Sequence, residues 1–414
     1  MPSRAVPPHV CDYYAEVGVR DRLVLAAGVS GPKLEELGAK SFLLGSTFEP
    51  AVMLRMPTTN VPGVSFAPEV AMFCFAHGVR LVTPEEAAAH ALPVVTSFVL
   101  TAADKSRMYG ACIVWYERLA DATVSAFLEE AEAAGAAAVS GQASVEGPPR
   151  GGVPEVHAPE AICLLSRVAV FDALMDSCRQ LFRMRLASNA PLAPLSLEAL
   201  LSTPVPAFNT SCEIPLGNVT IHASTPAANQ LPHTMAGRDF LQLFQALDVN
   251  NVIMLWALLL AEQKVVLQGR QPHVLTMAAE TLCALLFPFS WQHVYIPILP
   301  MRLLDILQAP VPFLIGIDEE ILSLAERQHM IPDDVVQVHT TRLPLGSTAP
   351  ADDAIRSPSD LHPISIRPPS DLQAHLHPGP VFLLSAPPPL TPFPPRPLML
   401  PLSLVSLSLS LSLS

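Results

Sequence analysis

A long and largely apolar stretch, residues 280–317, constrains the fold of this chain more than any other feature. No charged residue lies between Glu280 and Arg302, and a transmembrane helix needs only about 20 mostly apolar residues. However, three prolines and the polar run 290–293 interrupt the stretch. Because unpaired backbone groups are costly in lipid, we expect no transmembrane span. The pattern predicts a helix, an aromatic turn and a short strand inside a folded core.

Length and charge limit the class of protein. With 414 residues, half of them hydrophobic, the chain is long enough for two or three domains of about 150 residues. Its formal net charge is −13, whereas a nucleic-acid-binding protein needs a surplus of Lys and Arg to release counterions. We therefore expect no nucleic acid among its partners.

The cysteines indicate a reducing compartment. Seven cysteines are scattered along the chain without a CxxC pair, a pattern typical of free thiols and not of a disulfide framework or a zinc site. The N-terminus lacks the apolar segment of a secretory signal. The sequence therefore predicts a cytoplasmic protein.

The first part of the chain predicts an α/β lobe over residues 8–120. Within it, the β-rich runs 96–101 and 107–116 flank a short polar turn and predict a β-hairpin. Residues 121–159 are then expected to form an Ala-rich helix and a Gly/Pro linker. This linker would separate the first lobe from the next.

Strand and helix patterns alternate over residues 160–320 and predict a second α/β lobe. The segment 252–260 is apolar nearly all round, so we expect it to be a buried helix. Further elements are expected as strands at 161–166 and 264–267, and as helices from Phe171, from Asp239 and over 272–287.

The last part of the chain changes character. Residues 321–341 lead into a region, 342–414, that is rich in proline and ends in a Ser/Leu alternation. Such low-complexity sequence cannot bury a core, and we expect a disordered tail. A membrane anchor is the alternative, but the tail contains no uninterrupted apolar segment of about 20 residues.

Motifs that would indicate catalysis are missing. The sequence contains no phosphate-binding GxxxxGK[ST], no GxGxxG after a strand, no HExxH and no GxSxG. Cys112 and Cys283 lie in apolar surroundings without a neighbouring His or Lys, so both are expected to be inert. We therefore expect a binding protein, not an enzyme, with no cofactor and no metal.

Two parts of the sequence resemble the DENN-domain family of Rab guanine-nucleotide exchange factors. The stronger match is 239–317, which includes LFPFSWQHVYIPILP at 286–300 and APVPFLIGI at 309–317. The runs 97–101 and 107–112 resemble the upstream DENN segment. Together the resemblance covers about residues 10–340.

The resemblance implies a longin-like N-terminal lobe at 8–120 and a central DENN lobe at 160–320. Family members continue into a helical downstream segment, and here 321–341 is similar only to its beginning. The implied partner is a Rab-family small GTPase, bound across both lobes without a cofactor. The implied location is the cytoplasm, with peripheral attachment to vesicle membranes through partners.

Candidate GTPase contacts are polar or amphipathic residues at breaks in apolar sequence, where aromatic side chains flanked by polar ones make good interface anchors. The competing interpretation is structural. Trp291 and Tyr295 could belong to the core, and the turn at Asp248 could cap a helix. The candidates are Asp248, Asn250, Asn251, Trp291, Gln292, His293 and Tyr295.

Three functions remain open at this point. The first is nucleotide exchange on a Rab, and the second is a non-catalytic scaffold that binds a small GTPase or a membrane adaptor. The third is GTPase activation by an inserted arginine. Arg107 or Arg167 would be the candidates, although nothing in the local sequence singles out either of them.

Overall fold

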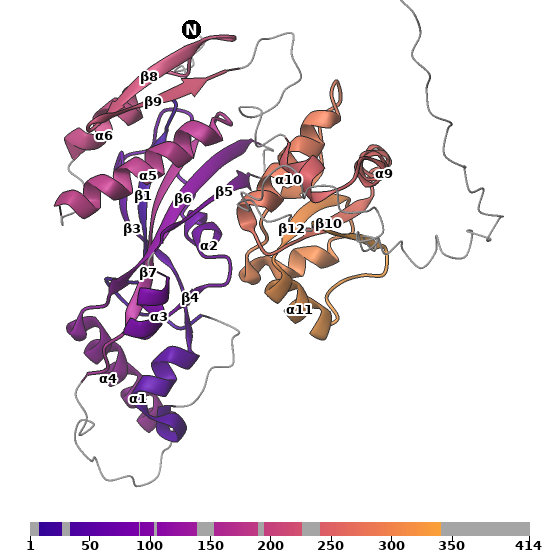
Figure 1. The fold of residues 1–414 in the computed structure, drawn as a ribbon. Coiled ribbons are helices and arrows are strands. Elements are labelled where there is room, and N and C mark those ends of the chain that lie inside the picture. Colours follow the sequence, from indigo (N-terminus) through magenta and orange to yellow (C-terminus); the bar gives the residue numbers. More distant parts are fainter. Residues whose placement is uncertain are drawn as a thin grey trace, which may run out of the picture. The chain divides into compact units, whose positions relative to one another are not determined.

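A computed structural model describes residues 8–26, 34–90, 92–102, 106–138, 153–188, 194–225 and 241–340. By its internal contacts the chain divides into two units, Met1–Gln373 and Ala374–Ser414. All of the described structure belongs to the first unit (Figure 1). Residues 141–152 of the linker expected over 141–159, the helix start at Asp239 and the tail from 342 lie outside the described residues, whereas 157–159 begin the strand His157–Ser166 and are no linker.

The first lobe is built on a five-stranded sheet in the order β3-β1-β7-β6-β5 (Figure 1). Every neighbouring pair in it is antiparallel. The predicted hairpin is confirmed as β5 and β6, with Val94 opposite Val114 and Thr101 opposite Arg107. The strands are β1 Tyr13–Gly18, β3 Ala51–Met56, β5 Val94–Thr101, β6 Arg107–Arg118 and β7 His157–Ser166.

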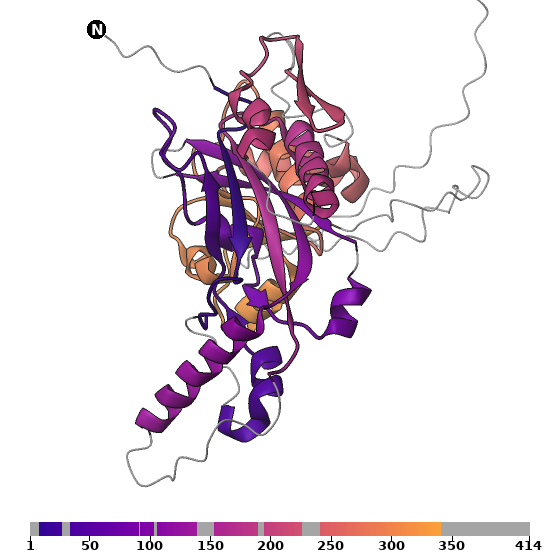
Figure 2. The same ribbon diagram turned by 90° about the vertical axis from the view of Figure 1, so that its left-hand side faces the viewer.

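Helices cover both faces of this sheet (Figure 2). Because side chains alternate along a strand, Ile162 and Leu164 of β7 pack in one cluster with α5, whereas Cys163 and Leu165 pack in another with α1, α2 and α4. The helices are α1 Leu34–Gly45, α2 Val70–Cys74, α4 Asp121–Ala138 and α5 Phe171–Ser188. The predicted helix after residue 120 is thus confirmed as α4.

Smaller elements complete this lobe. The hairpin of β8 and β9 and the helix α6 contact α5 or β1 at one end of the sheet. Their bounds are α6 Pro194–Ser202, β8 Ser211–Leu216 and β9 Val219–Ser224. The remaining short elements are β2 Thr47–Phe48, β4 Val79–Arg80 and α3 Pro84–Ala89.

The structure places residues 157–225 in the first lobe, although the sequence assigned residues from 160 onward to the second. Strand β7 lies between β1 and β6, and its strand-to-helix transition into α5 was correctly anticipated. Pairing partners of a buried strand are set by contacts distant in sequence. The apolar run 161–165 therefore predicts a strand without indicating which sheet it joins.

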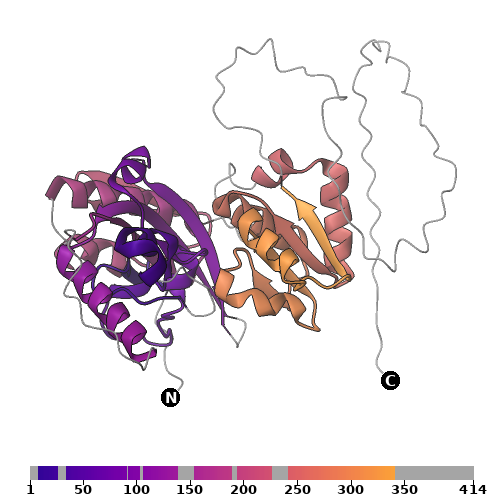
Figure 3. The ribbon, with the colours of Figure 1, turned by 90° about the horizontal axis from the view of Figure 1, so that it is seen from below.

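The second lobe contains a parallel four-stranded sheet in the order β11-β12-β10-β13 (Figure 3). Val265 and Leu267 of β10 pack in one cluster with α10, and Val266 packs in another with α11. The strands are β10 Lys264–Gln268, β11 Val294–Ile296, β12 Phe313–Ile317 and β13 Val335–His339. The helices are α8 Gln242–Ala246, α9 Val249–Leu260, α10 Pro272–Leu285, the 3-10 helix η1 Met301–Gln308 and α11 Glu319–Arg327.

The largely apolar stretch 280–317 folds as predicted, into a helix, a turn and a buried strand. It comprises the end of α10, the aromatic turn, β11, η1 and β12. No helix among the described residues is both long and apolar enough to cross a membrane. Strand β11 contributes Tyr295 and Ile296 to the core.

The segment 321–341, expected to begin a further segment, instead completes the second sheet. Strand β13 pairs in parallel with β10 over five residue pairs, from Lys264 opposite Val335 to Gln268 opposite His339. Its valines at 335, 336 and 338 are at most 4% exposed. This strand is therefore part of the hydrophobic core of the lobe.

The two sheets are joined through β5 of the first lobe. Thr276 Oγ1 of α10 donates a hydrogen bond to the carbonyl oxygen of Ser97, at 2.7 Å. Thr101 Oγ1 donates to the carbonyl oxygen of Tyr295, at 2.9 Å. Val99 and Leu275 share one hydrophobic cluster, so the core continues from one lobe into the other.

Candidate protein-interaction site

Helix α9 begins at a well-formed cap. The Asp248 carboxylate accepts hydrogen bonds from the backbone N–H groups of Asn250, at 2.9 Å, and Asn251, at 3.0 Å. The side-chain amide of Asn251 also donates to this carboxylate. Asp248 and Asn250 remain exposed to solvent. Two of the predicted contact residues, Asp248 and Asn250, therefore lie at the start of α9 and are accessible to a partner.

Only one face of α9 is buried, contrary to the expectation of a fully buried helix. Val252, Leu255 and Leu259 pack into the core. Four residues of a neighbouring row, which we call the α9 stripe, follow the helical spacing i, i+4, i+7, i+11. Their exposed fractions are Val249 61%, Ile253 56%, Trp256 40% and Leu260 40%.

The apolar surface extends beyond the stripe. Residues of α8, of α9 itself and of the turn after α10 add large side chains that are also exposed. These are Leu241, Phe244, Met254, Phe287 and Phe289. A concentration of this kind is the mark of an interaction surface, whereas single exposed apolar residues are ordinary.

The α9 stripe is held in a fixed position. Trp256 Nε1 donates a hydrogen bond to the carbonyl oxygen of Leu285, at 3.0 Å, which ties the middle of α9 to the end of α10. Figure 1 shows α9 close to α10 in this lobe. A surface that is already ordered loses little side-chain entropy when a partner binds.

The predicted residues 291–293 lie near the other end of α9. His293 Nε2 is 3.1 Å from a carboxylate oxygen of Glu262, which follows the helix. Gln292 is exposed and bonds to Ser290. Trp291 is only 7% exposed, and its Nε1 donates to the carbonyl oxygen of Val294, at 3.1 Å. Of these residues, Gln292 offers an accessible polar group, whereas His293 is partly buried and its Nε2 is shielded from solvent.

Tyr295 belongs to the interior, where the lobes join. It is 1% exposed, and its hydroxyl donates to Glu280 Oε1 at 2.5 Å. The guanidinium of Arg107, from β6, lies 4.3 Å from the centre of the tyrosine ring and 4.0 Å from the same carboxylate oxygen. Burial raises the pKa of Glu280, against the lowering effects of the hydrogen bond from Tyr295 and of the charge of Arg107.

The two arginines considered for GTPase activation both have partners inside the fold. Arg107 interacts with Glu280 and Tyr295, and its side chain is 22% exposed. Arg167 donates two hydrogen bonds to Asp12 through Nε and one, at 2.9 Å, through Nη2. The Asp12 side chain is completely buried. Removing either arginine from its partner would leave a buried carboxylate uncompensated.

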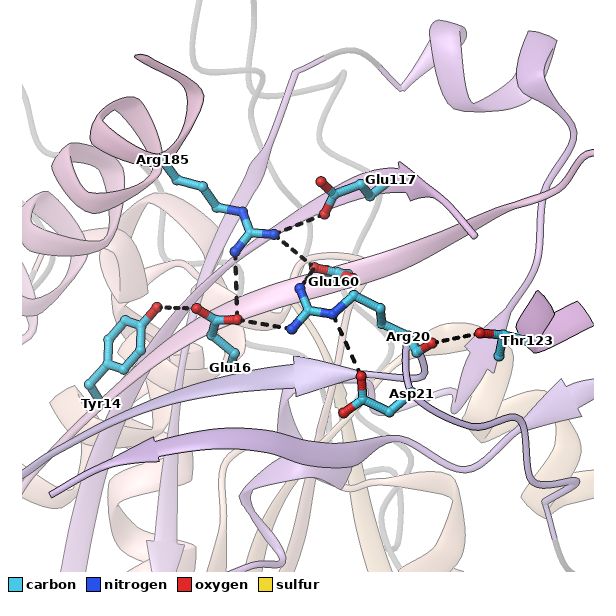
Figure 4. A network of polar contacts seen from close by, with 8 residues as sticks. All are labelled: Tyr14, Glu16, Arg20, Asp21, Glu117, Thr123, Glu160 and Arg185. Atoms are coloured by element: carbon cyan, nitrogen blue, oxygen red, sulfur yellow. Dashed lines mark hydrogen bonds and ion pairs between the residues drawn. The ribbon is translucent and has the colours of Figure 1, made fainter. Parts of the chain in front are cut away.

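A second group of charges lies in the first lobe, near the C-terminal end of α5 (Figure 4). Arg185 of α5 contacts Glu16 of β1 at 3.5 Å, Glu117 of β6 at 3.1 Å and Glu160 of β7 at 3.4 Å. Arg20 contacts Glu16 and Glu160, both at 3.4 Å. We call these five residues the buried charge network, although only Glu16, Glu160 and Arg185 are buried and Glu117 and Arg20 lie nearer the surface.

Burial is the main cause that raises the pKa of Glu160, to about 7, and the neighbouring Glu117 adds to the effect. The pKa of Glu117 is lowered, since its hydrogen bond with Glu160 and the charge of Arg185 together outweigh its own partial burial. A carboxyl with such a pKa could act as an acid or base. Here each carboxylate contacts the guanidinium of Arg185, and Glu16 and Glu160 also contact that of Arg20, so we interpret the network as structural.

No group of three or more His, Cys, Asp or Glu side chains suited to a metal ion occurs in the described part of the chain. Burial, together with hydrogen bonding to Cys74 in the case of Cys112, raises the thiol pKa of Cys112 and Cys283, the latter to about 12. Thiols of this kind are poor nucleophiles. The most distinctive surface feature is therefore the α9 stripe, with Asp248 and Asn250 at one end and Gln292 and His293 near the other.

Sequence reasoning did not identify the stripe. The run 249–260 contains enough apolar residues for two faces, and periodicity cannot tell which face a protein core will cover. The polar residues at its ends gave the only sequence signal. Whether the predicted residues contact a GTPase stays a prediction.

Comparison with known proteins agrees with the fold. The model of the DENN (AEX-3) domain matches residues 157–341, and the model of the uDENN domain matches residues 50–115. Mouse DENN domain-containing protein 1B is 34% identical over 168 residues, which are 40% of this chain and 21% of that protein. Mouse DENN domain-containing protein 2A is 32% identical over 171 residues, 40% of this chain and 17% of that protein. Human DENN domain-containing protein 2B is 32% identical over 164 residues, 38% of this chain and 14% of that protein.

The structure thus consists of two α/β lobes that share a core, with an exposed apolar row on a helix of the second. The matches to the uDENN and DENN domain models cover most of both lobes. The chain belongs to the DENN family. The matched region spans about a fifth or less of the length of these curated relatives.

Proposed function

We propose that this chain is a guanine-nucleotide exchange factor for a Rab-family small GTPase and that the GTPase binds on the α9 stripe. Family membership supports the activity, because the DENN family as a whole is associated with Rab exchange. The α9 stripe is the observation that carries the proposed position. On this proposal the chain acts in vesicle trafficking, in the cytoplasm and at vesicle surfaces reached through its partners.

The composition of the surface fits a protein partner. Protein interfaces combine an apolar centre, in which Trp is enriched, with a polar rim. In α9 the centre would be Ile253 and Trp256, and the rim would be Asp248, Asn250 and His293. Between Asp248 and Glu262 the helix has no charged side chain. A partner surface that is apolar, with basic groups at its margins, would complement these acidic ends.

Exchange on such a surface needs no bond-making chemistry. A factor that binds the nucleotide-free GTPase more tightly than the loaded form must weaken nucleotide binding by the same factor. What the protein contributes is a rigid surface that favours one arrangement of the GTPase. The shared core of the two lobes and the bond from Trp256 to Leu285 provide that rigidity.

The experiment is the release of fluorescent GDP from a panel of Rab proteins in the presence of the purified chain. We expect at least one Rab to release GDP faster, and Ile253→Ser to reduce this acceleration about tenfold or more, as for a central interface residue. Leu92→Ser is the matched control, because Leu92 is 84% exposed on the first lobe. If no Rab responds to the unmodified chain, exchange is the wrong activity.

The second candidate is a scaffold that binds a small GTPase or a membrane adaptor without exchanging nucleotide. It is favoured by the same stripe, since the exposed side chains account for binding alone. Equal affinity for GDP-loaded and nucleotide-free Rab would support the scaffold. A clear preference for the nucleotide-free form would support exchange.

A further inference from the structure

A pocket of about 470 Å³ opens at the outer edge of the second sheet, away from the residues of the α9 stripe. Leu322 of α11 contributes an apolar wall, and Gln268 of β10 and Gln337 and His339 of β13 line the other side. Gln268 stands opposite His339 in the strand register. The volume lies within the usual range of ligand sites.

Gln268 gives this pocket an unused hydrogen-bond acceptor. The residue is 3% exposed, and its Oε1 has no hydrogen-bond partner among the described residues. Buried polar atoms are nearly always paired, and one left unpaired destabilises the fold. A ligand that brings an N–H group into the pocket would satisfy this oxygen.

The charge of the pocket is acidic. Glu319 and Glu326, two turns apart on α11, both line it. Glu319 is bonded by the exposed Arg270 at 2.6 Å, whereas Glu326 has no ion pair with a described residue. No Lys or Arg is among the described residues that line the pocket. The site is therefore suited to a cation that also donates hydrogen bonds.

The pocket adjoins an open strand edge. In the described sheet, β13 pairs with β10 on one side and with no strand on the other. The backbone N–H of Thr340 points toward β10, where it bonds to Gln268. Because the backbone N–H and C=O groups of successive residues point to opposite sides of a strand, those of Gln337 and His339 point to the open edge. The two residues that line the pocket thus also offer backbone groups to an added strand.

We propose that the edge of β13 binds an extended segment of a partner protein, and that this segment inserts an Arg or Lys side chain into the pocket. Backbone hydrogen bonds to the strand edge would supply affinity, and the basic side chain would supply specificity. The Gln268 oxygen and the Glu326 carboxylate would accept hydrogen bonds from the cation. This site uses other elements than the proposed GTPase surface and does not depend on it.

The test uses two labelled peptides and the full chain. One peptide is acetyl-Thr-Val-Arg-Val-Thr-amide, and its twin carries citrulline, which has nearly the same shape as arginine but no charge. Fluorescence anisotropy should show at least tenfold tighter binding of the arginine peptide. Glu326→Gln should remove that difference, because it removes the carboxylate charge that attracts the arginine. The variant should still fold, since Glu326 is exposed and glutamine has nearly the same shape. Glu129→Gln, an exposed position on α4, should leave the difference unchanged.

Two results would overturn the proposal. The first is equal binding of the two peptides, or a preference that survives Glu326→Gln. The second is binding that occurs only after Arg342→Ala, which would show that this chain's own arginine, two residues beyond Thr340, fills the pocket. A preference seen in the unmodified chain and lost in Glu326→Gln supports the proposal.

Discussion

The buried charge network of the first lobe and the α9 stripe of the second are opposite departures from the usual distribution of side chains. In the network, Glu16, Glu160 and Arg185 are buried, and they contact one another and the more exposed Glu117 and Arg20. In the stripe, four apolar side chains are left outside, each at least 40% exposed. The charged group is satisfied internally, whereas the apolar one is not. On our proposal, the unusual charge has a structural role and the exposed apolar surface is the binding site.

This comparison predicts that changes in the network alter stability and that changes in the stripe alter binding. The largest effect is expected from Arg185→Ala, which removes the cation shared by Glu16, Glu117 and Glu160. Breaking a buried ion pair by removing one partner costs about 3–5 kcal/mol. Denaturant-induced unfolding measures this loss. The control is Arg179→Ala, whose pair with Asp176 is exposed and should be worth less than about 1 kcal/mol.

The next effect concerns pH. The pKa of Glu160 rises from 4.5 to about 7 on folding, so the folded state holds a proton that the unfolded state has lost. The contribution of this proton to the stability of the folded state is complete below pH 4.5 and is lost as the pH rises to about 7. The expected slope is a loss of at most about 1.4 kcal/mol of stability per pH unit.

Unfolding free energies at pH 5, 6 and 7 test this expectation against the variant Glu160→Gln. Glutamine cannot ionise, so this part of the pH dependence of the unfolding free energy should disappear in the variant. The side chain at position 160 would then contact Arg20 and Arg185 as a neutral group. An identical slope in the two proteins would assign the pH dependence to other groups.

A smaller effect is expected at the start of α9. Asp248→Ala removes the acceptor for the backbone N–H groups of Asn250 and Asn251, which should lower the unfolding free energy by about 1 kcal/mol. Asn250→Ala keeps that cap and is the matched control. Thermal unfolding compares the two variants. If only Asp248→Ala lowers stability and neither lowers GTPase binding, Asp248 has a structural role alone.

The smallest effect on stability is expected from Ile253→Ser. Its side chain is more than half exposed, and substitutions at such positions usually change the unfolding free energy by less than about 0.5 kcal/mol. The variant should therefore unfold like the unmodified protein in denaturant while losing its partner. A loss of several kcal/mol would show that the stripe contributes to the fold, and the contrast with the charge network would fail.

Much of the local structure could be predicted from the sequence. Alternating and continuous apolar runs identified the β5–β6 hairpin, β10 and the transition from β7 into α5, because each depends on neighbouring residues. The prolines and polar residues between 288 and 300 correctly excluded a single long helix. The mixed α/β class and the DENN family followed from these patterns and from the motifs at 239–317.

The sequence could not predict how the elements assemble. Strand β7 joins the first sheet and β13 joins the second, although their positions in the chain indicated otherwise. Tyr295 and His293 are two residues apart in a run that looked uniform, yet one is 1% exposed beside Glu280 and the other lies near the surface beside Glu262. Such differences arise from pairing and packing between residues distant in the chain.

By itself, the sequence determined several strands and helices of the second lobe, the absence of the usual catalytic motifs and the family. The tertiary structure decided which apolar surface stays open. In α9 apolar side chains face both the core and the solvent, because the core covers Val252, Leu255 and Leu259 and leaves the stripe at least 40% exposed. The sequence specifies how apolar a helix is, and packing specifies which of its faces remains for a partner.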